Sequence, residues 1–85
     1  MSEIADARLK RLKLRAWRRG TKEMDLILGG FADRQLAAMD DTSLTHFDAL
    51  LDEDDQDLYD WVCGRASAPP VHAALVARIA GETGL

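Results

Sequence analysis

The chain has 85 residues, of which 47% are hydrophobic and 31% are charged, and its net charge is −4 at neutral pH. A chain of this length is expected to form one domain, residues 1–85, with little room for an interior catalytic cavity. It contains one cysteine, Cys63, which excludes an internal disulfide bond and a metal site built from several thiolates. We interpret Cys63 as a small helix-packing residue rather than a redox thiol.

The charge is divided unevenly along the sequence. Residues 1–22 carry eight basic and two acidic side chains, a net charge of +6, whereas residues 23–85 carry three basic and thirteen acidic ones, a net charge of −10. A basic segment such as residues 8–22 can attract an acidic protein, a nucleic acid or an anionic lipid. The alternative is a solvated helix whose charges complement the acidic remainder of the same chain. One hypothesis is therefore a small helical nucleic-acid-binding or regulatory protein that uses this basic segment. Against it, the acidic remainder of the chain would repel a polyanion.

The apolar spacing predicts an all-α fold, a compact bundle of about five short helices. A first helix is expected over residues 3–18, and Trp17 is expected to pack beside its narrow apolar stripe. A second helix is expected over residues 21–39. Its broad apolar face makes it the candidate core helix and contains Met24, Ile27, Leu28, Phe31, Ala32, Leu36 and Met39.

Two adjacent glycines, Gly29 and Gly30, lie inside this second helix. Each glycine costs about 1 kcal/mol relative to alanine in a helix interior, so the pair needs an explanation. We interpret it as a place where a neighbouring helix approaches closely. The alternative is a locally loosened point beside a docking surface.

Three shorter helices are expected in the second half of the chain. Capping residues at 40–43 predict the start of a third helix. The acidic run at 52–57 is expected to precede a fourth helix that ends at Gly64. We interpret its acids as favouring the helix start. A calcium site is not expected, because the glycine and glutamate that an EF-hand loop requires are missing.

The fifth helix is expected to begin near Pro70, since proline suits the first turn of a helix. Gly81 and Gly84 are expected to end it. Its expected apolar positions are Val71, Leu75, Val76 and Ile79.

The sequence does not predict catalytic chemistry. His46 and His72 have no orienting acid or metal-ligand pattern beside them, so we expect both on the surface. No nucleophile with a base, phosphate-binding loop or dinucleotide fingerprint can be recognised. We therefore expect a binding protein that is not an enzyme and has no cofactor of its own.

The candidate site is the segment RRGTKEMD, residues 18–25, between the first two helices. Gly20 can adopt a positive φ and close off the first helix. Thr21 can cap the second helix, and Glu23 and Asp25 suit the positive end of its dipole.

Turn chemistry does not account for Arg18 and Arg19 beside these two carboxylates. We interpret the ionic cluster as a patch that docks another protein.

The same segment resembles the R-G-x-x-E-x-D signature of the small bacterial and mitochondrial assembly factors of succinate dehydrogenase. Arg19, Gly20, Glu23 and Asp25 match this signature. A second resemblance lies at residues 50–61, where LLDEDDQDLYDW is similar to the family's paired leucines, acidic run and aromatic residues. Within it, Tyr59 and Trp61 are expected to have packing roles. Together the resemblance covers roughly residues 8–80.

This resemblance implies a protein that binds the flavoprotein subunit of succinate dehydrogenase, with fumarate reductase as a further client. It would help FAD to become covalently linked to a histidine of that subunit. We further expect no nucleic-acid or membrane partner, a monomer when free, and a location in the bacterial cytoplasm.

The resemblance also implies the partner-binding residues Arg18, Arg19, Gly20, Glu23 and Asp25. Gly20 would let the client's backbone approach closely. The carboxylates would pair with client cations and the arginines with client carboxylates. This hypothesis requires both Glu23 and Asp25 to point outward rather than to be buried and paired within their own chain.

Overall fold

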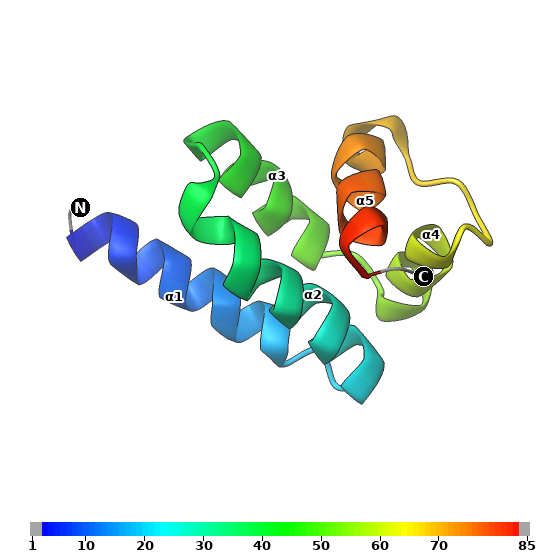
Figure 1. Ribbon diagram of the computed structural model, residues 1–85, viewed down its shortest axis with the longest axis horizontal. Coiled ribbons are helices and arrows are strands. Elements are labelled where there is room, and N and C mark those ends of the chain that lie inside the picture. Colours follow the sequence, from blue (N-terminus) through cyan, green and yellow to red (C-terminus); the bar gives the residue numbers. More distant parts are fainter. Residues whose placement is uncertain (1–2, 84–85) are drawn as a thin grey trace. The chain divides into compact units, whose positions relative to one another are not determined.

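The computed structural model describes residues 3–83, which form five α-helices and one short 3₁₀ helix and contain no strand. The helices are α1 (Glu3–Trp17), α2 (Lys22–Gln35), η1 (Leu36–Ala38), α3 (Asp41–Leu51), α4 (Asp55–Cys63) and α5 (Pro70–Thr83) (Figure 1). The prediction of an all-α fold with five helices is confirmed. The chain divides into two compact units, residues 1–39 and 40–85, and the expectation of one domain stays a prediction.

The first unit is a hairpin in which α1 and α2 lie side by side, with η1 packed against both (Figure 1). The apolar face predicted for the second helix is its core. Its buried members are Met24, Ile27, Leu28, Phe31, Ala32 and Leu36. From α1, Leu12 and Ala16 are buried as well. The second helix is shorter than predicted, because residues 36–38 tighten into a 3₁₀ turn, as helix ends commonly do.

The indole of Trp17 explains the glycine at position 29. A Cβ atom on Gly29 would lie 2.5 Å from Cε2 and 2.7 Å from Cγ of Trp17, and closer still to Cδ2. Because these three carbons are bonded in sequence within the ring, the face of the indole must lie against the glycine backbone. The indole Nε1–H also donates a hydrogen bond to Asp33 Oδ2 at 3.2 Å. The predicted close approach is therefore confirmed at Gly29, where it is made by the last side chain of α1.

Gly30 has different surroundings. A Cβ atom there would first meet the guanidinium of Arg34, with Nη1 at 3.1 Å. This group is the far end of a flexible side chain of the same helix, and it can move aside. The two glycines are thus not equivalent, and the close-approach interpretation applies to Gly29 alone.

This difference predicts that two alanine substitutions change the stability of the protein in opposite directions. Gly30→Ala should stabilise the protein by about 0.5–1 kcal/mol, the usual gain in a helix interior. Gly29→Ala should instead destabilise it by about 1–3 kcal/mol, because the methyl group must displace the indole. Urea unfolding measures both. A Trp61→Phe background leaves Trp17 as the sole tryptophan, and its emission should shift to the red in Gly29→Ala. A Gly29→Ala protein as stable as its parent would contradict the prediction.

In the second unit, α5 packs against both α3 and α4. The buried apolar side chains of this unit come from all three helices and are Leu44, Phe47, Leu50, Leu51, Leu58, Val62, Val76 and Ile79. Two predicted helix starts are confirmed: Asp40 caps α3, and Pro70 is the first residue of α5. The predicted stop at Gly81 is wrong, since α5 continues to Thr83, and Gly84 lies outside the described residues.

The cap of α3 has an electrostatic consequence. Asp40 Oδ1 accepts the backbone N–H of Ser43 at 2.8 Å. This hydrogen bond, and a second one with the Ser43 side chain, lower the pKa of the Asp40 carboxyl below its usual value, with a smaller contribution from His46.

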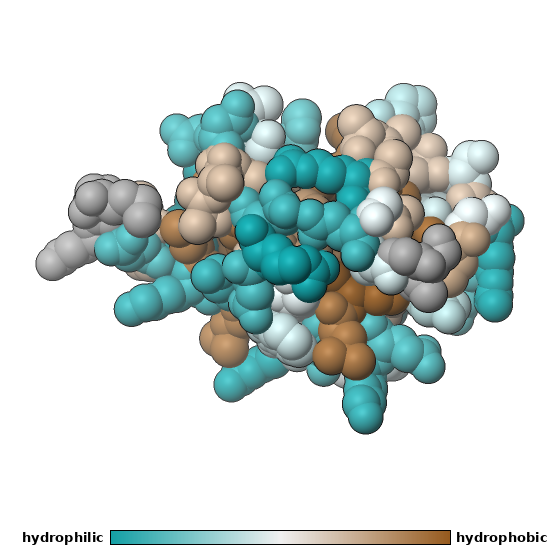
Figure 2. Space-filling view, viewed as in Figure 1, coloured by the Kyte–Doolittle hydropathy of each residue, from teal (hydrophilic) through white to brown (hydrophobic). Residues whose placement is uncertain are grey.

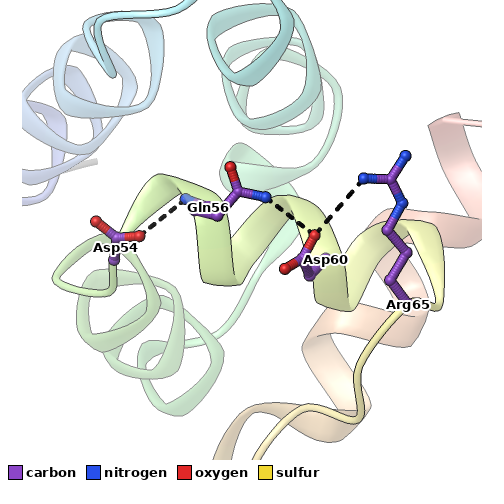
Figure 3. A network of polar contacts seen from close by, with 4 residues as sticks. All are labelled: Asp54, Gln56, Asp60 and Arg65. Carbon is purple, nitrogen blue, oxygen red and sulfur yellow. Dashed lines mark hydrogen bonds and ion pairs between the residues drawn. The ribbon is translucent and has the colours of Figure 1, made fainter.

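The acidic run serves the start of α4, as predicted. Asp54 Oδ2 accepts the backbone N–H of Gln56 at 3.0 Å. The Gln56 amide donates to Asp60 Oδ1 at 3.1 Å, and this oxygen also lies 3.9 Å from Arg65 Nη1 (Figure 3). Gly64 ends the helix with a φ of 80°, a conformation that side chains disfavour.

Contrary to the prediction for the histidines, His72 is buried, with 5% of its surface exposed. Its Nε2 lies 2.9 Å from Glu53 Oε2, within hydrogen-bond distance, and the imidazole N–H is the donor to an ionised carboxylate. Its ring also stacks on Trp61, with centroids 5.9 Å apart. Val71, one of the expected apolar positions of α5, is 64% exposed. The inward stripe of α5 starts one residue later, at His72. His46 is exposed, as expected.

Replacing the two histidines should therefore have unequal effects on stability. His72→Ala should destabilise the protein by about 2–3 kcal/mol, because it removes both a hydrogen bond to a charged group and an aromatic contact. His46→Ala, at an exposed position, should change stability by less than about 0.5 kcal/mol. Thermal or denaturant unfolding of the two variants measures the difference. Equal losses of stability in the two variants would contradict the prediction.

Candidate functional site: the turn between α1 and α2

The residues between α1 and α2 form a tight connection whose conformation agrees with the sequence prediction. Gly20 has a φ of 105°, in the region that glycine adopts more readily than other residues. Thr21 is the N-cap of α2, and its Oγ1 accepts the backbone N–H of Met24 at 3.3 Å. The predicted positive φ of Gly20 and the predicted cap by Thr21 are confirmed.

Asp25 reaches back over this turn and closes it. Its Oδ1 accepts the backbone N–H of Arg19 at 2.6 Å, and its own backbone N–H donates to Thr21 O at 3.0 Å. The side chain is half-buried. A hydrogen bond between a backbone N–H and a carboxylate stabilises a structure by about 1.5–3 kcal/mol at best, and partial exposure reduces that contribution. Asp25 therefore holds the two helix ends in register.

The remaining predicted site residues face outward to different degrees. Arg18, Gly20 and Glu23 are exposed, and Arg19 is half-buried. A Cβ atom on Gly20 would meet nothing within 4 Å, so the backbone there is open to approach. The requirement that both carboxylates point outward is thus met by Glu23, whereas one oxygen of Asp25 is engaged by its own chain. Partner binding by all five residues stays a prediction.

Sequence reasoning treated the two carboxylates as equivalent and missed the closing role of Asp25. The spacing carries a signal for it. In a capping box, an acid at the third helical position reaches back to the N-cap. Asp25 is the fourth residue of α2 and reaches two residues further back, to Arg19.

A concave feature also occurs in the second unit. It is a hollow of about 140 Å³ between α3 and α5, lined by Ser43, His46, Ala74, Leu75 and Arg78. Ligand pockets usually have volumes of about 300–1,000 Å³, so this hollow is small for a cofactor. The Asp40 carboxylate interacts electrostatically with His46 and bonds Ser43, which weakens any attraction for an anion.

Two further findings concern metals and membranes. Within residues 3–83, no three side chains of the metal-binding types gather where they could hold an ion. No helix in that range has both the length and the apolar content that a bilayer-spanning segment needs.

The fold and the turn define a small all-helical protein that presents ionic side chains between its first two helices. Comparison with known families agrees with the resemblance found in the sequence. The family model described as the flavinator of succinate dehydrogenase matches residues 10–83, and the chain belongs to this family.

Individual relatives support the same assignment. The chain is 39% identical over 72 residues to the FAD assembly factor SdhE of Acetobacter pasteurianus, covering 85% of this chain and 66% of that protein. It is 42% identical over 67 residues to the mitochondrial succinate dehydrogenase assembly factor 2 of Schizosaccharomyces pombe, covering 79% and 48%. Its identity to the protein of the same name from Mycosarcoma maydis is 40% over 68 residues, covering 80% and 29%.

The matched segment thus spans between about three-tenths and two-thirds of the length of these relatives. These relatives are named as assembly factors, in agreement with the sequence prediction.

The geometry of the turn predicts that the two carboxylates respond differently to substitution. Asp25→Ala should destabilise the protein by about 1–2 kcal/mol, because the N–H of Arg19 loses its partner. Asp25→Asn keeps an acceptor oxygen and should recover at least half of that loss. Glu23→Gln, at an exposed position, should change stability by less than about 0.5 kcal/mol. Urea unfolding of the three variants measures this order. A Glu23→Gln protein as destabilised as Asp25→Ala would contradict it.

Proposed function

We propose that this chain is an FAD assembly factor that binds the flavoprotein subunit of succinate dehydrogenase and promotes covalent attachment of FAD to that subunit. The observation that carries the proposal is the match of the flavinator family to residues 10–83. The similarity to the FAD assembly factor of Acetobacter pasteurianus supports it and suggests the bacterial cytoplasm as the location. The mitochondrial relatives are about equally similar, so cell fractionation is the test of location.

In this proposal the chain contributes positioning, while the flavin and its client protein carry out the bond-forming chemistry. Glu23 and Arg18 would contact the client from the exposed part of the turn. Gly20 would admit the client's backbone. Arg19 and Asp25 would maintain the shape of the turn through the hydrogen bond that joins them.

The contact made by Glu23 decides whether the complex forms. A charge-assisted hydrogen bond of about 1.5–3 kcal/mol corresponds to about a 10- to 100-fold change in affinity, which is enough to disrupt a transient complex. Affinity for the client should therefore depend on Glu23 far more than on other exposed acids of the chain.

The experiment combines the purified flavin-free subunit with FAD, in the presence or absence of the chain. Covalent flavin is measured by its fluorescence in the denatured subunit, and binding is measured in parallel. The wild-type chain should accelerate flavin attachment. Glu23→Gln should weaken binding at least about tenfold. Glu82→Gln makes the same chemical change at an exposed position on α5 and should match the wild type.

The outcomes separate the function from the site. A wild-type chain that neither binds the subunit nor accelerates attachment would refute the proposed function. Equal behaviour of the two glutamine variants would refute the role of Glu23 alone. The flavoprotein subunit of fumarate reductase, assayed in the same way, tests the second client.

A further inference from the structure

Three large apolar side chains on the α1–α2 hairpin, close to its turn in the sequence, are exposed. Leu14 is 49% exposed, Trp17 37% and Leu26 55%. Leu14 and Trp17 are three residues apart and share a face of α1, while Leu26 and Gly29 have the same spacing on α2. Because Trp17 lies on Gly29, the two faces join into one surface, which we call the indole face. Figure 2 shows hydrophobic atoms at the surface over this hairpin, among hydrophilic ones.

The indole is held in a fixed orientation on this surface. One face of its ring is covered by Gly29, and its N–H is bonded to Asp33, while 37% of the side chain remains exposed. A restrained, partly exposed tryptophan loses little conformational freedom when a partner covers it. Such side chains dominate the binding energy of many protein interfaces.

The charges around the indole face indicate the chemistry of a partner. Lys10 lies one turn before Leu14 on the same side of α1, Lys22 lies one turn before Leu26 on α2, and all of Lys10, Arg18 and Lys22 are exposed. An apolar centre with a charged rim is the usual anatomy of a protein interface. The three cations outnumber the Asp33 carboxylate that accepts the indole N–H, so the rim favours a partner with acidic groups around an apolar centre.

The same charges disfavour a second copy of this chain. In a two-fold symmetric dimer each face meets its own counterpart, so the lysines of both copies would gather around one contact. Repulsion between them would oppose self-association through the indole face. The two leucines, in turn, offer nothing to the phosphates of a nucleic acid.

We propose that the indole face docks an apolar, acid-rimmed surface of the flavoprotein subunit. This proposal rests on the proposed function and adds to it a contact distinct from the ionic turn. The turn supplies directional hydrogen bonds, whereas the indole face supplies apolar burial. Because apolar contacts mainly set the lifetime of a complex and rim charges mainly set its rate of formation, the two contributions can be measured separately.

Binding kinetics with the purified flavoprotein subunit test the proposal. The double variant Leu14→Ala/Leu26→Ala should bind at least about tenfold more weakly, mainly through faster dissociation. Val71→Ala is the matched control, because Val71 is 64% exposed and belongs to α5 of the other unit, and its loss should leave both rates unchanged. Lys10→Gln should slow association by a factor of about two to five at low salt, and the effect should vanish near 0.5 M salt. Circular dichroism confirms that each variant is folded.

Each other outcome overturns the inference. If the wild type binds and the double variant binds with the same two rates, the indole face is not part of the interface, although the proposed function stands. If the wild type does not bind the subunit, the proposed function fails as well. If the wild type sediments as a dimer that the double variant dissociates, while subunit binding is unchanged, the face serves self-association.

Discussion

The hydrogen bond between the Arg19 backbone and the Asp25 carboxylate is the contact on which the first unit depends. It joins the end of α1 to the first turn of α2 across 2.6 Å and fixes how the two helices leave the turn. On either side of this bond, Trp17 of α1 packs on Gly29 of α2, and Glu23 is exposed. One carboxylate therefore shapes the surface on which the other is presented.

Much of the fold could be predicted from the sequence because its signals are local. The apolar face of α2, the caps at Thr21 and Asp40, and the glycine stop at Gly64 each depend on residues a few positions apart. The resemblance to the family could also be recognised from the sequence, because four signature residues fall within one short segment. The structure and the family comparison confirm these predictions.

The errors on α5 follow from one contact between residues that are distant in sequence. His72 is buried because Glu53, nineteen residues earlier, provides a partner for its imidazole, and no local pattern reveals that pairing. Val71 is apolar and was expected in the apolar stripe of this helix, but the helical phase set by His72, Val76 and Ile79 turns it outward. The bond from the Arg19 N–H to Asp25 was not predicted, because its spacing exceeds that of a capping box, and partner binding by Asp25 stays a prediction.

The stacking of Trp17 on Gly29 also constrains how the hairpin can evolve. The indole of Trp17 fills the space that a side chain at position 29 would need. A larger residue at position 29 therefore requires a smaller one at position 17. A relative with a bulky residue at the position of Gly29 should carry a small one at the position of Trp17. Such a paired exchange at the two positions would keep the distance between α1 and α2 constant while it changes the side chains exposed on the outer surface. Client preference could therefore diverge between species without any change in the signature turn.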